Sequence, residues 1–224
     1  MASSGVHRPS AGPSLGRRSF LGALGATVLA ACTGGNGDGT SAATTLPLVD
    51  VGADPFTLGV ASGDPLAGSV ILWTRLVDGD LPGEGVPVGW TIAADESLDD
   101  VVGSGTVMAD GALGHAVHVE ATDLEPDTTY WYRFAVGDFE SPVGRTRTLP
   151  PPDSSPESLR FAVASCADYQ QGWFTPYPHL ADEDLAFVFF LGDYIYEEPA
   201  IGLPTEVREH EGGETVTLAD YRQR

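Results

Sequence analysis

The sequence predicts two domains, an all-β sandwich followed by the start of an α/β domain. Short segments of alternating polar and apolar residues, separated by Gly, Pro and Asp, fill residues 53–149. A Pro- and Ser-rich stretch, residues 150–158, then interrupts this pattern and is expected to be a linker. In residues 159–224 two continuous apolar segments flank a predicted helix, which is typical of a parallel β–α–β unit covered on both faces.

The first domain is expected to contain seven short strands, whose spacing favours a two-sheet sandwich. The sixth shows the alternation most clearly, because Tyr130, Tyr132, Phe134 and Val136 fall on one face. The turn before it, LEPDTTY, resembles the tyrosine corner of fibronectin-III/Ig-like sandwiches, in which a Tyr hydroxyl bonds back to the turn. The seven segments are PFTLGVASGD, GSVILWTRLV, VPVGWTIAAD, VVGSGTVMAD, HAVHVEAT, TTYWYRFAVG and GRTRTL.

The second domain is expected to open with two parallel strands. RFAVASC (Arg160–Cys166) is expected to be a short apolar strand, and AFVFFLGD (Ala186–Asp193) a second one. GWFTPYPHLADEDL between them is expected to contain a helix, whose early prolines are tolerated at its start. Parallel strands joined by such a crossover end at the same edge of the sheet, where ligands bind. Cys166 and Asp193 are therefore expected to lie side by side.

These strand ends carry side chains that suit a metal ion. Tyr196 follows Asp193 by three residues, so both side chains can turn toward one point. A phenol with a pKa near ~10 binds a metal only when a strong Lewis acid removes its proton, which ferric iron does well and zinc, magnesium and calcium do poorly. A Cys thiol, with a pKa near ~8.5, ionises readily beside the same ion. Cys166, Asp193 and Tyr196 thus suggest an iron site; the alternative is a packed aromatic turn of Tyr194 and Tyr196 capped by Asp193.

The charge of the chain argues against binding to nucleic acid. It has 11 Arg, no Lys and 32 acidic residues, a formal net charge of −21. Such a surface repels polyanions at long range, so no nucleic-acid-binding groove is expected. A site for phosphate would need a local source of positive charge, and a metal ion is the obvious one.

The N-terminus has the layout of a bacterial export signal. Residues 1–31 contain Arg17 and Arg18, which resemble the start of a twin-arginine signal, and an apolar run that is too short to span a bilayer. LAAC, ending at Cys32, resembles a lipobox, in which the cysteine is lipidated. Residues 32–52 are then expected to be a flexible tether. An ordinary membrane-anchoring or secretory helix is the alternative.

Several segments together resemble the alkaline phosphatase D, or PhoD-like, phosphatase/phosphodiesterase family. They are FTLGVASGDPLAGSVILWTRL, the tyrosine-corner strand, FAVASCADYQQGWFTPYPHLADEDL and FVFFLGDYIYE. The resemblance implies a β-sandwich followed by a calcineurin-like metallophosphoesterase domain that hydrolyses phosphate esters by hydroxide attack at two metals. It also implies Fe3+ held by Cys166, Asp193 and Tyr196, with Asp193 bridging to Ca2+.

The resemblance runs from about Pro55 to the last residue. The final segment, TVTLADYRQR, predicts the start of a helix with Thr217 as its N-cap and Asp220 three residues on. Segments that complete the two-metal site in such enzymes are not found, so the metallophosphoesterase domain is expected to be incomplete and the chain alone inactive. Asp168 lies near a strand end and could support a ligand, whereas His179 and His210 are weaker candidates.

Two functions follow from these observations. The first is an exported, iron-dependent phosphomonoesterase or phosphodiesterase, anchored through Cys32 at the outer face of the cytoplasmic membrane or secreted. Its expected partners are a phosphate-ester substrate, the twin-arginine export machinery and the membrane, and it is expected to be a monomer. The second is a lipid-tethered cell-surface sandwich that binds a partner and carries a vestigial enzyme remnant. A binding module has no use for Cys166, Asp193 and Tyr196 together, so these three residues discriminate between the two.

Overall fold

The computed structural model describes residues 51–77, 81–200, 202 and 204–224. The export-signal arginines Arg17 and Arg18, the lipidation site Cys32 and most of the expected tether lie outside the described residues. Within the described part of the chain, no helix has the length and apolarity needed to cross a membrane.

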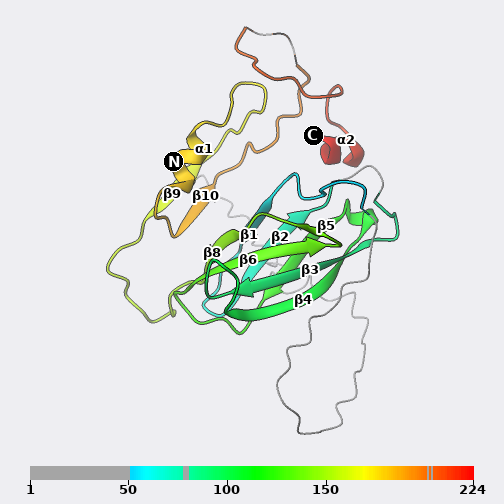
Figure 1. Ribbon diagram of the computed structural model, residues 1–224. Coiled ribbons are helices and arrows are strands. Elements are labelled where there is room, and N and C mark those ends of the chain that lie inside the picture. Colours follow the sequence, from blue (N-terminus) through cyan, green and yellow to red (C-terminus); the bar gives the residue numbers. More distant parts are fainter. Residues whose placement is uncertain (1–50, 78–80, 201, 203) are drawn as a thin grey trace, which may run out of the picture. The chain divides into compact units, whose positions relative to one another are not determined.

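Eight strands make up the first part of the described chain, shown in cyan to green in Figure 1. All seven expected segments contain a strand, and the eighth is a two-residue strand, β7. It forms because the chain reverses at Gly137, which has a φ of 55°, and pairs Phe139 with Val136. The strands are β1 (Val60–Gly63), β2 (Val70–Arg75), β3 (Val86–Ala93), β4 (Val101–Ala109), β5 (Ala116–Ala121), β6 (Thr129–Val136), β7 (Phe139–Glu140) and β8 (Gly144–Arg147).

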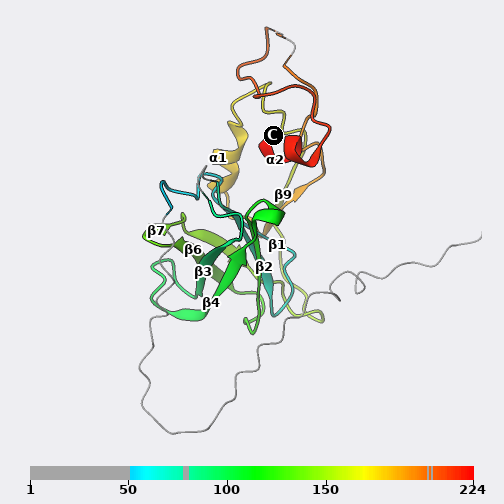
Figure 2. The ribbon, with the colours of Figure 1, turned by 90° about the vertical axis from the view of Figure 1, so that its right-hand side faces the viewer.

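These strands form two antiparallel sheets, as the sequence predicts for a sandwich. One sheet has the order β1–β2–β5, and the other has the order β4–β3–β6. Both β7 and β8 pair with the remaining edge of β6, β8 along its first half and β7 at its end. The side view in Figure 2 shows β1 and β2 in one layer and β3, β4 and β6 in the other.

A single hydrophobic core lies between the sheets. The alternation predicted for β6 is present, since its four inward side chains are at most 3% exposed while their neighbours are partly exposed. Val51, expected in the tether, is only 7% exposed and packs in this core, so the core starts before residue 53. The buried members from the sheets include Val70, Leu72, Val86, Val88, Ile92, Val117, Val119, Tyr130, Tyr132, Phe134 and Val136.

The tyrosine corner predicted from LEPDTTY is present. The backbone N–H of Glu125 donates to the hydroxyl of Tyr130 over 2.9 Å. The same turn is held by Thr148, the residue after β8, whose hydroxyl donates to the carbonyl of Glu125 at 2.7 Å and accepts from the N–H of Thr128 at 3.0 Å. The turn between the sheets is thus fixed at both ends by buried or partly buried side chains.

The later part of the chain forms a short parallel β–α–β unit. β9 (Phe161–Ala164) pairs in parallel with β10 (Phe187–Phe190), and α1 (Pro176–Ala181) connects them with prolines in its first turn. A second helix, α2 (Leu218–Gln223), begins at Thr217, whose side chain accepts from the N–H of Asp220 while the Asp220 carboxylate accepts from the N–H of Thr217. The parallel pair and the cap of α2 were both predicted from the sequence.

The expectation that this parallel pair is covered on both faces is wrong for the described residues. Phe161, Val163, Val188 and Phe189 are each between 49% and 57% exposed. The only helix between the strands has six residues, too few to cover either face, and the described sheet has only two strands. The apolar sequence of these two strands is typical of a buried sheet. The described residues nevertheless leave the sheet exposed.

Candidate metal centre

The ends of β9 and β10 stay paired beyond the last strand residues. Leu191 N–H donates to the carbonyl of Ala164 at 2.8 Å, Cys166 N–H to that of Gly192 at 3.2 Å, and Ala167 N–H to that of Asp193 at 2.9 Å. These bonds carry the parallel ladder into the loops that follow the strands. They place Cys166 and Asp193 next to each other, as the sequence predicts.

Both residues have a left-handed backbone. The φ angle is 60° at Cys166 and 52° at Asp193, and Gly192 before Asp193 has a φ of 112°. Asp adopts this region more readily than most residues, whereas Cys does so rarely. Unusual backbone conformations held by surrounding hydrogen bonds gather at functional sites, so two of them at one sheet edge mark it as a candidate site.

The three predicted ligands converge at this edge. The Cys166 Sγ lies 3.7 Å from Asp193 Oδ2 and 3.4 Å from the hydroxyl of Ser165. Tyr196 is partly buried against them, and a hydrogen bond to the Cys166 side chain is the main reason that its pKa is raised to about 12. Partial burial and the charges of Cys166, Asp193 and Asp168 raise this pKa further. The site thus gathers groups that are anionic when ionised.

No three His, Cys, Asp or Glu side chains in the described part of the chain lie close enough together to hold a metal ion. Cys166 and Asp193 are only two such residues, and a third donor at this edge would be the Tyr196 phenol. The carboxylate of Asp168, whose charge contributes to the raised pKa of Tyr196, accepts a hydrogen bond from the N–H of Gln170 at 2.9 Å. It therefore helps to fix the loop that follows Cys166.

The two histidines considered from the sequence have different surroundings. His179 is an exposed residue in the last turn of α1. The ring of His210 stacks on Tyr169, with ring centroids 4.7 Å apart. Burial is the main cause of its lowered pKa, and the charges of Arg224 and Arg208 lower it further, while that of Asp168 opposes them. His210 is thus part of the packing around the loop after Cys166.

Two arginines near the site were missed in the sequence analysis. Arg224 donates to the backbone carbonyl of Tyr196 at 2.9 Å, and Arg208 donates to that of Tyr169 at 2.9 Å. The available signal was compositional: in a chain that has no Lys and 32 acidic residues, Arg208 and Arg224 both follow the predicted metal loop.

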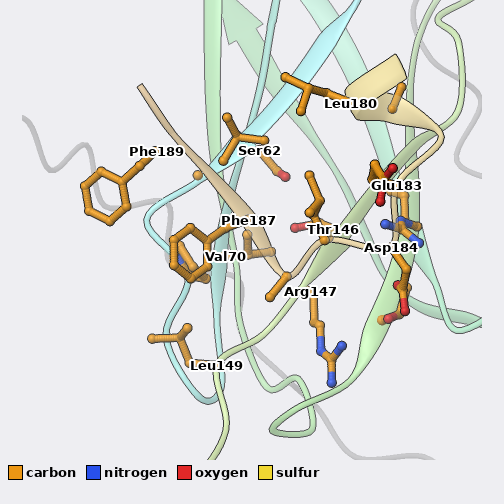
Figure 3. Close-up of a pocket in the computed structure, with 18 of the residues that line it drawn as sticks. Ser62, Val70, Thr146, Arg147, Leu149, Leu180, Glu183, Asp184, Phe187 and Phe189 are labelled. Carbon is orange, nitrogen blue, oxygen red and sulfur yellow. The ribbon is translucent and has the colours of Figure 1, made fainter. Parts of the chain in front are cut away.

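A pocket of about 940 Å³ lies elsewhere, along the body of β10 rather than at its end. Figure 3 shows its apolar side chains, among them Phe187, Val70 and Leu149, and the carboxylates of Glu183 and Asp184 on another side. None of the three predicted ligands lines this pocket. Part of its apolar lining comes from the exposed strand β10, and the rest comes from residues such as Val70 and Leu149.

Comparison with known proteins gives consistent matches for both parts of the chain. Residues 41–150 match the model described as PhoD-like phosphatase, N-terminal domain, and residues 161–224 match the model described as PhoD-like phosphatase. Alkaline phosphatase D of Bacillus subtilis (strain 168) is 50% identical over 178 residues, which cover 76% of this chain and 30% of the relative.

A solved structure of PhoD has the same fold over the matched region. It is 49% identical, superposes with a TM-score of 0.76, and the match covers 79% of this chain and 35% of that chain. The chain thus spans about a third of the length of these two relatives. Together the two family matches and the two relatives establish that the chain belongs to the PhoD-like phosphatase family.

Proposed function

We propose that this chain supplies the sandwich and part of the metal centre of an exported, metal-dependent phosphoric ester hydrolase. The enzyme would be a phosphomonoesterase or phosphodiesterase of the alkaline phosphatase D type, and residues 159–224 would begin its metallophosphoesterase domain. The observation that carries the proposal is the convergence of Cys166, Asp193 and Tyr196 at the carboxyl ends of two adjacent parallel strands. Membership of the PhoD-like family supports the choice of phosphate esters as substrates.

The donor set fits ferric iron. Protein donors bind a transition-metal ion at about 2.0–2.3 Å, so two donors on one ion lie roughly 3–4 Å apart. The 3.7 Å between Cys166 Sγ and Asp193 Oδ2 agrees with this separation. A phenol is an effective ligand mainly for a strong Lewis acid such as Fe3+. Cys166, Asp193 and Tyr196 would therefore hold Fe3+.

A second ion would share the Asp193 carboxylate. Calcium binds oxygen donors, and a carboxylate can bridge two ions. The family resemblance favours Ca2+ at this second position. When bound, the two ions would polarise the phosphate ester and lower the pKa of a water molecule so that hydroxide becomes available at neutral pH. The residues of this chain would hold and orient the metal ions. The other ligands of the second ion would come from residues beyond those described.

We further propose that the enzyme works outside the cytoplasm. The arginine pair Arg17 and Arg18 would direct it to the twin-arginine export machinery, and lipid on Cys32 would hold it at the outer face of the cytoplasmic membrane unless it is released. The strongly acidic chain is expected to act as a monomer on phosphate esters and to offer no groove for nucleic acid.

Binding of ferric iron tests this proposal against the alternative of a non-catalytic surface module. The 224-residue chain, titrated with ferric nitrilotriacetate, is expected to develop a visible tyrosinate-to-iron absorption band with weak affinity. Tyr196→Phe should abolish the band. Tyr194→Phe is the matched control, because Tyr194 is 70% exposed and packs edge-on against Phe190 rather than on the Cys166 side chain.

The outcomes separate the two functions. Loss of the band in Tyr196→Phe together with its retention in Tyr194→Phe supports the metal centre. A wild-type chain that shows no band even at high iron concentration contradicts the proposal and favours the surface module. A band that survives Tyr196→Phe shows that iron binds through other groups.

A further inference from the structure

We propose that residues 207–224 form a brace that positions the metal ligands, and that Arg208 and Arg224 are its two positioning residues. The brace contacts both loops that leave the ends of β9 and β10, one carrying Cys166 and the other carrying Tyr196. The assignment to metal binding rests on the proposed function, whereas the brace itself rests on the hydrogen bonds described below.

The first arm of the brace holds the loop that follows Cys166. The Nε–H of Arg208 donates to the carbonyl of Tyr169 at 2.9 Å, and its Nη2 donates to the carbonyl of Gly172. The guanidinium also lies over the rings of Tyr169 and Phe174, 3.9 Å and 4.5 Å from their centroids. Beside it, the Val207 N–H donates to the carbonyl of Gln170 at 2.8 Å. Arg208 therefore binds this loop in two ways: its N–H groups donate to backbone carbonyls, and its guanidinium lies over aromatic rings.

The second arm holds the loop that carries Tyr196. The Nη1 of Arg224 donates to the carbonyls of Tyr196 at 2.9 Å and Glu198 at 3.1 Å. Glu197 between them is held twice more, through its carbonyl by the N–H of Thr215 and through its carboxylate by the hydroxyl of Tyr221, each at 2.9 Å. Three successive residues that include the predicted phenol ligand are thus bound by the brace.

The two arms are parts of one short piece of chain. Arg224 also donates from Nη2 to the carbonyl of Gly213 at 2.7 Å. This bond connects the last residue of the brace to its middle. The capping box of Thr217 and Asp220 fixes the start of α2, and so the distance from Thr215 to Arg224. One arm binds the loop after Cys166 and the other binds the loop that carries Tyr196. The brace therefore fixes the distance between Cys166 and Tyr196.

The brace is also tied to the sandwich. Arg222 on α2 donates from Nη2 to the carbonyl of Ala112 at 2.5 Å. Ala112 lies in a short 3-10 turn (Gly111–Leu113) that ends at Gly114, whose φ is 67°. A β-carbon added at Gly114 would lie 3.1 Å from Arg222 Nε, so this glycine leaves the arginine its place. The bond of Arg222 therefore connects the brace to the sandwich.

Arg208 and Arg224 donate to backbone carbonyls, although the chain is rich in acidic side chains. Among the described residues, the ion pairs are Arg133–Glu140, Arg147–Asp127 and Arg160–Glu183, and neither Arg208 nor Arg224 has a carboxylate partner. Bonds to neutral carbonyls leave the positive charge of each guanidinium uncancelled.

The test combines hydrogen exchange of the metal-free chain with ferric titration. Arg224→Ala is expected to speed amide exchange at Thr215, and Arg208→Ala to speed it at Val207, each by about tenfold, because these amides bond to the two loops. Each variant is expected to weaken ferric binding about 10–100-fold, the usual loss when groups that orient metal ligands are removed. Arg160→Ala is the control, since its exposed ion pair lies at the opposite end of β9.

Each outcome has one meaning. Faster exchange together with weaker iron binding in both brace variants, with no change in Arg160→Ala, supports the brace as a positioning device. Unchanged exchange in the brace variants overturns it. Faster exchange with unchanged iron affinity also overturns the positioning role, because the brace then only stabilises the loops. If the wild-type chain binds no iron while exchange changes as expected, the brace stands and the proposed metal centre fails.

Discussion

The tyrosine corner gives a stability prediction that can be worked from one hydrogen bond. Tyr130 is 3% exposed, and its ring packs in the sandwich core while its hydroxyl accepts from the N–H of Glu125 at 2.9 Å. The change Tyr130→Phe keeps the ring and removes only the oxygen. The N–H of Glu125 then loses its partner at a partly buried position.

The expected loss in the free energy of unfolding is small. One neutral, partly buried hydrogen bond contributes about 1 kcal/mol net to the free energy of unfolding. The turn keeps its second anchor, because Thr148 still donates to the carbonyl of Glu125 at 2.7 Å, so the strands on either side should not separate. For a domain of roughly 100 residues, about 1 kcal/mol corresponds to a fall in Tm of roughly 4–8 °C.

Urea unfolding followed by circular dichroism and tryptophan fluorescence measures this loss. Tyr130→Phe should lower the midpoint without changing the slope m, since the surface exposed on unfolding is almost unchanged. Tyr194→Phe, at a residue that is 70% exposed in the loop after β10, should leave the midpoint unchanged. A loss below about 0.3 kcal/mol would show that the corner bond contributes nothing net, and a loss above about 3 kcal/mol would show that the turn depends on it for folding.

Further predictions concern packing, domain organisation and activity. Gly144→Ala should destabilise the sandwich by about 1–3 kcal/mol, because the new methyl would lie within 2.7 Å of the Tyr132 ring, which is only 2% exposed; an unchanged urea midpoint would contradict this. Limited proteolysis should leave a stable piece ending near Pro150, since the residues before it share one buried core whereas β9 and β10 are exposed; loss of both parts at the same rate would argue against two domains. The 224-residue chain should hydrolyse p-nitrophenyl phosphate no faster than buffer, because two-metal hydrolysis needs ligands for a second ion that the described residues do not supply; metal-dependent turnover by the chain alone would show that the assigned site is wrong.

Local pattern in the sequence was enough to predict the sandwich. Side chains alternate across a strand, so the apolar set Tyr130, Tyr132, Phe134 and Val136 could face only one way. Gly, Pro and Asp clusters located the turns, and LEPDTTY predicted a specific bond between a turn and a strand that is present. The two-residue strand β7 was missed, because its pairing depends on the reversal at Gly137 rather than on any pattern of its own.

The candidate metal centre was also predictable, for a topological reason. Parallel strands joined by a crossover end at one edge of the sheet, so residues 27 apart in sequence, Cys166 and Asp193, could be placed together before any coordinates were known. Tyr196 followed because it is three residues from Asp193. The left-handed backbone at both strand ends was not predicted, since it is imposed by hydrogen bonds between the two loops.

Only the tertiary structure showed which contacts hold the loops that carry Cys166 and Tyr196, and that β9 and β10 are exposed. The bonds of Arg208 to Tyr169 and of Arg224 to Tyr196 span 39 and 28 residues, and no periodicity or short motif encodes a contact between a side chain and a distant backbone carbonyl. The exposure of β9 and β10 could not be predicted either. The apolar sequence of a strand indicates that its side chains favour burial, but it does not show whether the rest of the chain covers them. Local sequence therefore determined which elements form and where the parallel strands end, and long-range contacts decided how those ends are held.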